Sequence, residues 1–241
     1  MKGLIGVLGG MGPAATVDLF SKFIKHTDAV RDQDHIPLII SSIPDIPDRT
    51  TALMNNGQSP LPILRDYLHK LEDFGAECII IPCNTAHYWF QALKDICHIE
   101  ILSIVETTMA SVAASGKKRI GLLATDATLY MGLYQKAIEN LGLSCIQPEL
   151  ESQKKIMESI YALKSGDKSK AKSLLHEQVE SLFHLGAEVI ILGCTEIPLI
   201  LSKEIEKDPN LYIDSTDTLV CESIKWYEKR TKKTKRLIKQ R

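Results

Sequence analysis

Two cysteines occupy matching places in a repeated segment of this chain. The run GAECIIIPCNTAH (residues 75–87) has an echo in GAEVIILGCTE (residues 186–196). In both copies the cysteine stands eight residues after the glycine, which places Cys83 and Cys194 in equivalent positions. A pseudo-twofold molecule built this way can bring both thiols to one cleft. Two opposed acid/base groups are what proton exchange at a stereocentre requires.

The surroundings of the two cysteines favour reactive thiols. Each follows an apolar run that is typical of a buried strand, and each precedes a helical pattern. The turn between strand and helix offers free backbone N–H groups and the positive end of a helix dipole, which stabilise a thiolate or a carboxylate. A single cysteine here would more simply be a small buried hydrophobe. Two at matching positions, one followed by Asn-Thr and the other by Thr-Glu, favour the chemical interpretation.

Strand and helix patterns alternate along the whole chain. Apolar runs predict strands, and amphipathic runs with Pro near the start or Gly at the end predict helices. The predicted strands are residues 4–10, 37–43, 77–82, 100–106, 119–125, 143–148, 188–193 and 211–216. The predicted helices are residues 13–27, 61–75, 86–96, a segment directly after the strand 100–106, 130–142, 151–185 with a break at 165–167, 197–205 and 216–230, and residues 46–60 are expected to form a loop.

This alternation predicts an α/β fold of two similar domains, each a parallel sheet flanked by helices and related by a pseudo-twofold. Ligands of such sheets bind at the carboxyl ends of the strands, where both cysteines stand, so the site is expected in the cleft between the domains. We assign residues 1–102 and 208–241 to the domain that carries Cys83. Residues 103–207 form the domain that carries Cys194. The end of the chain is expected to fold back because it has no echo in the first half.

The composition describes an ordinary soluble protein. The 241 residues are 44% hydrophobic and 24% charged, with a net charge of −1, so no overall field favours nucleic acid. The basic stretch 229–241 is interpreted as a solvated tail, with an anionic surface as the alternative partner. No apolar run approaches the roughly 18 residues that a membrane span needs. Six cysteines without a CxxC pair or a secretory signal predict reduced thiols and a cytoplasmic location.

Five segments together resemble the aspartate/glutamate racemase family, and within it the cofactor-independent aspartate racemase branch. They are GLIGVLGGMGP (3–13), RDQDHIP (31–37), IPDRT (46–50), PCNTAH (82–87) and GCTE (193–196). The resemblance covers the chain to about Tyr227. It implies a small amino-acid substrate, aspartate first, no cofactor, no metal and a homodimer. It also implies that Cys83 and Cys194 are catalytic: one thiolate removes the Cα proton and the opposite thiol returns a proton to the other face.

The resemblance also implies which residues around the two thiols bind substrate. Asn84 and Thr85 match residues that hold the α-carboxylate, together with backbone N–H groups. Thr125 and Thr195 match positions that do similar work from the second half. Glu196, beside the second thiol, is expected either to tune that thiol or to anchor its loop.

Gly10, Met11, Arg49 and Lys164 also carry over from the family pattern, and His87 is considered beside them. Gly10 and Met11 lie in the first turn, where a small residue lets substrate approach the backbone. Arg49 matches an arginine that contacts a substrate carboxylate, with a loop cap as its alternative role. Lys164 matches a lysine of similar function, with a solvated helix end as its alternative. His87, one turn past the first thiol, could orient the site or pack beneath the helix.

Two departures bear on the substrate. The glutamate branch carries an Asp-Ser pair in the first turn, whereas this chain has Gly-Gly-Met-Gly at residues 9–12, which favours aspartate. The aspartate branch usually has an Asn pair before IPDRT, whereas this chain has Ser42-Ile43. Glutamate, a broader amino-acid range, or the chemistry of maleate-isomerase-like and hydantoin-racemase-like relatives therefore stay open.

A different class of function is a zinc-held binding module. A Cys-x3-His pair at helical spacing can ligate zinc, and Cys83 with His87 has that spacing. Cys194 and His98 would have to complete the site. This hypothesis requires that the four side chains meet at one point.

Overall fold

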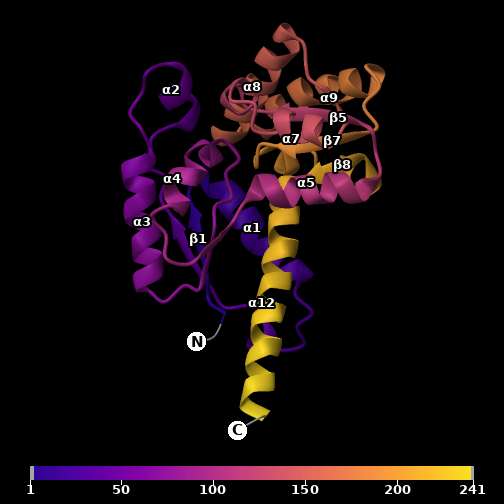
Figure 1. The fold of residues 1–241 in the computed structure, drawn as a ribbon. Helices are drawn as coiled ribbons and strands as arrows, with labels where there is room; N and C mark the ends of the chain where they lie inside the picture. Colours follow the sequence, from indigo (N-terminus) through magenta and orange to yellow (C-terminus); the bar gives the residue numbers. More distant parts are fainter. Residues whose placement is uncertain (1–2, 240–241) are drawn as a thin grey trace.

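The computed structural model describes residues 3–239, with side chains described to residue 232. It contains two parallel four-stranded sheets, one in each half of the chain (Figure 1). The first sheet consists of β1 (Ile5–Gly9), β2 (Leu38–Ser42), β3 (Cys78–Ile80) and β4 (Glu100–Leu102). The second consists of β5 (Arg119–Ala124), β6 (Ser144–Ile146), β7 (Val189–Gly193) and β8 (Tyr212–Asp214).

The two sheets have the same topology. Their strand orders are β2-β1-β3-β4 and β6-β5-β7-β8, so each strand of one half has a counterpart in the other. The second and third strands pair in parallel with the first in both halves, and the fourth pairs with the third. The predicted fold class, two similar α/β domains related by a pseudo-twofold, is confirmed.

Helices cover both sheets (Figure 1). In the first half they are α1 (Pro13–His26), η1 (Asp32–Asp34), α2 (Arg49–Met54), α3 (Leu61–Asp73), η2 (Thr85–Trp89) and α4 (Phe90–Lys94). In the rest of the chain they are α5 (Ile104–Ser115), α6 (Asp126–Tyr130), α7 (Gln135–Asn140), α8 (Leu150–Lys164), α9 (Lys168–His184), α10 (Ile197–Ile200), α11 (Ser202–Lys207), η3 (Pro209–Leu211) and α12 (Ser215–Lys239). None of the helices in the described part of the chain is both long and apolar enough to cross a membrane.

The repeated GAE motif is a helix stop followed by a packing contact. Gly75 and Gly186 end α3 and α9 with φ values of +91° and +95°, a region that glycine enters without steric penalty. In both copies the next residue is an alanine that faces a glycine on the central strand. A Cβ added to that glycine would stand 3.1 Å from the alanine Cβ in each half, for Gly6 with Ala76 and for Gly121 with Ala187. The GAE repeat therefore reflects a packing contact that is present in both halves of the fold.

Two predicted elements differ from the structure for reasons of capping. The expected loop 46–60 contains α2, which begins because the Asp48 carboxylate accepts a hydrogen bond from the Thr51 N–H at 2.8 Å. The expected helix 130–142 is divided into α6 and α7. Thr125 caps α6, so that helix starts earlier, and Gly132 in the left-handed region (φ +65°) separates the two pieces.

The end of the chain returns from the second half to the first. β8 pairs with β7, with Ile191 opposite Ile213, so it completes the second sheet as β4 completes the first. The expectation that residues 208–241 join the first domain therefore needs one correction: Tyr212–Asp214 belong to the second sheet. The helix that follows, α12, packs beside α1 and buries Leu219 and Val220 in the core cluster around β1 (Figure 1).

Most side chains of the basic tail predicted at 229–241 are outside what the structure describes. The backbone of α12 is described to residue 239 and its side chains to residue 232. Within that part Arg230 pairs with Glu77 at 2.7 Å. The interpretation of the remaining tail as solvated stays a prediction.

A buried histidine joins the turn after β3 to the start of α5. The Ile104 N–H donates to Nε2 of His87 at 3.0 Å, so that nitrogen carries no proton. Nδ1 must then be the protonated nitrogen, and it donates to the Cys83 carbonyl at 2.9 Å. Burial lowers the pKa of His87 to about 4, and the ring stays neutral. This geometry supports the packing role for His87.

The neutral state of His87 predicts a loss of stability in mild acid. The unfolded chain takes up a proton near the ordinary histidine pKa of about 6.5, whereas the folded chain resists it down to about 4. As pH falls through this window, the free energy of unfolding should drop by up to about 3 kcal/mol and then level off. Denaturant titrations between pH 7 and pH 4 measure this free energy of unfolding. The variant His87→Gln should lose this dependence of the free energy of unfolding on pH, and the exposed-site control His176→Gln should keep it. An unchanged pH dependence in His87→Gln would refute the neutral, buried state assigned to His87.

Candidate active site

The central strands of both sheets end at one cavity between the two halves. Met11 follows β1 and Cys83 follows β3, while Thr125 follows β5 and Cys194 follows β7. In each sheet these two neighbouring strands are the place where the strand order reverses, which is where open parallel sheets bind ligands. Two such binding edges face each other here across about 300 Å³ of space, part of which is open to solvent.

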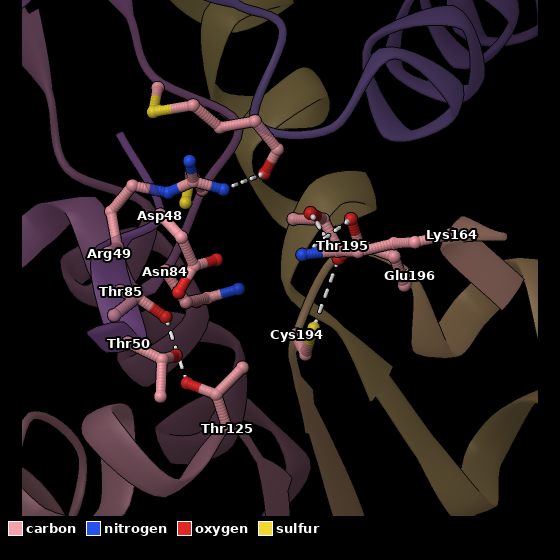
Figure 2. A pocket seen from close by; sticks show the side chains of 12 residues that line it. Asp48, Arg49, Thr50, Asn84, Thr85, Thr125, Lys164, Cys194, Thr195 and Glu196 are labelled. Carbon is pink, nitrogen blue, oxygen red and sulfur yellow. Dashed lines mark hydrogen bonds and ion pairs between the residues drawn. The ribbon is translucent and has the colours of Figure 1, made fainter. Parts of the chain in front are cut away.

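All ten side chains singled out from the sequence line this cavity. The complete lining is Met11, Asp48, Arg49, Thr50, Cys83, Asn84, Thr85, Thr125, Lys164, Cys194, Thr195 and Glu196. Figure 2 shows Arg49, Asn84 and Thr85 on one side and Lys164, Thr195 and Glu196 on the other. The sequence interpretation missed Asp48 and Thr50. They flank Arg49 at the start of α2. The sequence feature that could have identified them is the N-cap residue Asp48, which predicts a helix beginning at Arg49.

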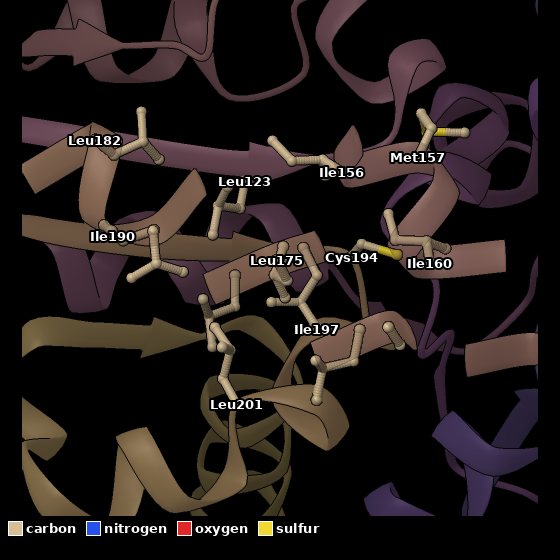
Figure 3. Close-up of a cluster of buried hydrophobic side chains, with 14 of the residues drawn as sticks. Leu123, Ile156, Met157, Ile160, Leu175, Leu182, Ile190, Cys194, Ile197 and Leu201 are labelled. Carbon is tan, nitrogen blue, oxygen red and sulfur yellow. The ribbon is translucent and has the colours of Figure 1, made fainter. Parts of the chain in front are cut away.

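Cys194 is a buried thiol held by its neighbour. Its Sγ donates to Oε2 of Glu196 at 3.1 Å. The sulfur also belongs to the apolar core of the second half, near Ile160 and Ile197 in Figure 3. Burial, and next the Glu196 carboxylate, raise the pKa of the Cys194 thiol well above its ordinary value, while Lys164 opposes them. At neutral pH this cysteine is therefore protonated.

Glu196 connects the second thiol to the rest of the cavity. Its Oε1 accepts the Gly12 N–H at 3.2 Å and lies 3.8 Å from Nζ of Lys164. Burial lowers the pKa of Lys164, but the Glu196 carboxylate is the main group that opposes burial, and the pKa is raised overall. Lys164 is thus a cation of the cavity wall rather than a solvated helix end.

Cys83 faces the same cavity from the first half. It is buried, and its side chain belongs to the apolar core around Leu8 and Ile81. Its carbonyl is the one that His87 holds. The two cysteines thus lie after equivalent strands in different polar surroundings.

Arg49 is a buried cation that pairs with backbone carbonyls. The side chain is 8% exposed. In the described part of the chain, Nη1 donates to Ile46 and Pro47 at 3.2 and 3.1 Å, and Nη2 donates to Met11 at 3.4 Å. Its Nε is buried without a hydrogen-bond partner there. A buried guanidinium with a free N–H can donate hydrogen bonds to a carboxylate, whose planar geometry it matches.

Asp48 places a negative charge beside the two cations. Burial raises its pKa, but hydrogen bonds from Thr51 and the charges of Arg49 and Lys164 outweigh burial and lower the pKa overall. The carboxylate is therefore ionised. It offers the cavity an acceptor for an ammonium group.

Three threonine hydroxyls tie the two halves together at the cavity. Thr85 lies 2.9 Å from Thr125 and 3.0 Å from Thr128, and the latter two lie 2.9 Å apart. Each hydroxyl can donate once and accept twice, so the triangle satisfies all three buried groups. The Thr125 hydroxyl also accepts the Thr128 N–H at 3.2 Å, and Thr85 and Thr125 both line the cavity.

Asn84 also crosses between the halves, which limits its expected role. Its carbonyl oxygen accepts from the Tyr134 hydroxyl at 2.5 Å, and its amide nitrogen donates to Ser215 at 3.0 Å. Only its second amide hydrogen and its backbone N–H are left for a ligand. Thr195 makes a similar link, with its hydroxyl 3.4 Å from the Pro82 carbonyl.

Gly10 has a packing reason to be glycine: its φ is +93°, and an added Cβ would stand 2.2 Å from the Ile43 nitrogen. The approach of substrate to its backbone stays a prediction. One expectation is overturned by the geometry, because the four proposed zinc ligands do not meet. Both ring nitrogens of His87 hold backbone groups, and His98 lies beside His69 and Glu72 instead.

The chain is similar to known racemases over nearly its full length. Residues 8–222 match the model of the Asp/Glu/Hydantoin racemase family. The solved aspartate racemase of Picrophilus torridus is 32% identical with a TM-score of 0.86, and the match covers 93% of this chain and 94% of that one. The broad specificity amino-acid racemase RacX of Bacillus subtilis is 27% identical over 93% of this chain and 98% of its own length. The glutamate racemase of Desulforudis audaxviator is 28% identical over 77% of this chain and 68% of its own length. The chain belongs to the Asp/Glu/Hydantoin racemase family and is an isomerase of the racemase type.

Proposed function

We propose that this enzyme interconverts L- and D-aspartate without a cofactor, with Cys83 and Cys194 as the two proton-transferring groups. The observation that carries the proposal is the pair of thiols on equivalent turns of one cavity, beside two cations. The similarity to the solved Picrophilus torridus aspartate racemase, with a TM-score of 0.86, supports the proposal. Roles for the lining residues follow from charge and hydrogen bonding.

The cavity charges suit an amino dicarboxylate. Arg49 and Lys164 supply two cations, and aspartate carries two carboxylates. In our proposal Arg49 binds the side-chain carboxylate, because its Nε is unpartnered in the described part of the chain. The α-carboxylate lies at the N–H groups of the turns after β3 and β7. The hydroxyl of Thr85 or Thr125 donates to it when it turns its proton away from the triangle. Asp48 accepts from the ammonium group.

Proton transfer then needs one thiolate and one thiol. In the resting enzyme we assign the thiol to Cys194, which is the protonated partner by burial. The thiolate of Cys83 takes the Cα proton, and the electron pair left on Cα is delocalised into the bound α-carboxylate. The Cys194 thiol gives its proton to the opposite face of Cα. The product has inverted configuration, Cys83 ends as a thiol and Cys194 as a thiolate, and the opposite enantiomer runs the steps in reverse.

Glu196 and Lys164 have opposite effects on the Cys194 thiolate. The carboxylate disfavours it and the ammonium stabilises it, so the pair sets how readily Cys194 can act as the base. We propose that Glu196 is a positioning residue that orients the thiol proton and holds the first turn through Gly12.

A wider substrate range is the second candidate. It is favoured by the full-length match to a relative named as a broad specificity amino-acid racemase and by the match to a glutamate racemase. The same two thiols would serve each substrate. Racemisation rates for aspartate, glutamate and neutral amino acids distinguish the candidates.

Replacing either thiol tests the proposed function. Cys83→Ser and Cys194→Ser should each lower aspartate racemisation by about a hundredfold or more, because each removes an acid/base group. Circular dichroism follows the conversion of each enantiomer. Cys145→Ser, which changes a thiol on β6 away from the cavity, should retain activity. Wild-type rates in either active-site variant, with an unchanged melting temperature, would refute the proposal.

The Glu196 charge should be visible in the reactivity of Cys194. Glu196→Gln removes a carboxylate that raises the pKa of Cys194, so that pKa should fall while burial still keeps it above its ordinary value. The rate of alkylation of Cys194 by iodoacetamide, followed by peptide mass spectrometry, should reach half its maximum at a lower pH. The exposed-site control Glu180→Gln should show the wild-type profile. A shift to higher pH in Glu196→Gln would contradict the role given to Glu196.

Arg49 should select for a second carboxylate. Charge-assisted hydrogen bonds contribute about 1.5–3 kcal/mol, so Arg49→Met should lower kcat/KM for aspartate by about tenfold to a hundredfold. Turnover of asparagine, which lacks the side-chain charge, should fall much less. Arg31→Met, at an exposed arginine paired with Asp34, is the matched control. Equal losses for aspartate and asparagine would show that Arg49 only supports the fold.

A further inference from the structure

A second group of side chains with metal-binding chemistry lies away from the cavity. His69 and Glu72 stand three residues apart near the end of α3, on one face of the helix. Cys97 and His98 stand in the loop between α4 and β4. Both segments lead into the amino ends of strands, β3 and β4, whereas the active-site cavity lies at the carboxyl ends.

The four donor groups meet at one carboxylate. Nδ1 of His69 lies 2.8 Å from Oε2 of Glu72. Nδ1 of His98 and Sγ of Cys97 lie 3.4 and 3.5 Å from Oε1 of the same carboxylate. The ligand atoms of His69, Glu72 and His98 all lie within 4.8 Å of one another.

Two of these distances, from Glu72 to His98 and to Cys97, match the edges of a tetrahedral zinc site, and the distance from His69 to Glu72 is shorter than such an edge. Zinc binds nitrogen and oxygen at about 2.0–2.1 Å and thiolate sulfur at about 2.3 Å, so its ligand atoms are roughly 3.3–3.7 Å apart. Two imidazoles, one carboxylate and one thiolate are ligands that zinc accepts. We propose that His69, Glu72, Cys97 and His98 bind a zinc ion.

The position of the group suits the capture of an ion from solvent. Glu72 is the most buried charged member, with 13% of its side chain exposed, and His98 is 84% exposed. The Glu72 carboxylate is fixed because Oε1 also accepts the His98 backbone N–H at 2.7 Å. The exposed imidazole beside this carboxylate lets an ion enter from solvent, and the Cys97 thiol, which is not among the ligand atoms within 4.8 Å of one another, must turn toward the ion to complete the site. The bound ion would join α3 to the loop before β4.

Within the described side chains a second group of this kind serves as a comparison. His26, Asp217 and Cys221 also bring ligand atoms together. Both groups have three members whose ligand atoms lie within 4.8 Å of one another, and the second includes its thiol, 3.9 Å from the carboxylate. The first has Cys97 beside its carboxylate as a further donor, whereas the second has no such fourth donor in the described part of the chain, so we expect the second to bind zinc more weakly.

Zinc titration of the full chain tests the proposal. Isothermal calorimetry with Zn²⁺ should give one site per chain in a Cys83→Ser/Cys194→Ser variant, in which the cavity thiols cannot contribute. Adding Cys97→Ser or Glu72→Gln should weaken binding by more than about tenfold, since even the outer partners of metal ligands contribute that much. Adding Cys221→Ser should leave the affinity unchanged. A Co²⁺ titration should show a thiolate charge-transfer band that Cys97→Ser abolishes.

The outcomes separate this site from the racemase site. One Zn²⁺ per chain that depends on Cys97 and Glu72 supports the proposal, as does racemase activity in Cys97→Ser equal to wild type. No stoichiometric binding, binding that survives both variants, or binding lost in Cys221→Ser would overturn it. Circular dichroism melts of Cys97→Ser and Glu72→Gln, both close in shape to the native residues, establish that a loss of binding is not a loss of fold.

Discussion

The hydroxyl triangle of Thr85, Thr125 and Thr128 holds the two halves of the molecule in register at the cavity. Each of these buried groups depends on the other two, and a buried hydroxyl without a partner destabilises a fold by about 1–3 kcal/mol. Asn84 and Thr195 add further links across the same join. Because Thr85 is two residues from one thiol and Thr195 is next to the other, these bonds also determine how the thiols face each other. Transfer of a proton to a second face of one carbon needs a geometry of this rigidity.

The scaffold is symmetric, but the charges around the thiols are not. Cys194 donates to an ionisable carboxylate inside an apolar core, whereas the turn of Cys83 is held by a neutral histidine. The pseudo-twofold thus supplies two equivalent positions, and the side chains that follow them make the two positions chemically different. The proposed mechanism uses this difference, because it needs one thiol and one thiolate and assigns the thiol to Cys194.

Much of this arrangement could be predicted because it is local in sequence. Strand periodicity and the GAE helix stop determine where each strand ends, and the residues directly after β3 and β7 are therefore brought to the cavity.

Other features depend on contacts between distant segments. Asn84 meets Tyr134 and Ser215, and only the tertiary structure shows that its side chain is occupied. The short helix α2 was missed because one aspartate cap outweighs the loop-like composition around it. The homodimer, the cytoplasmic location and the roles of the cavity residues stay predictions.

The central claim is that two different groups act on opposite faces of Cα, and solvent isotope incorporation tests it most directly. Each aspartate enantiomer is converted in D₂O to a small extent, and deuterium at Cα is measured by mass spectrometry in product and in remaining substrate. With two groups, nearly every product molecule carries deuterium, because the thiol that donates has exchanged with solvent, while the remaining substrate carries little. Product that retains the substrate's own proton would mean that one group both removes and returns it, and would contradict the account.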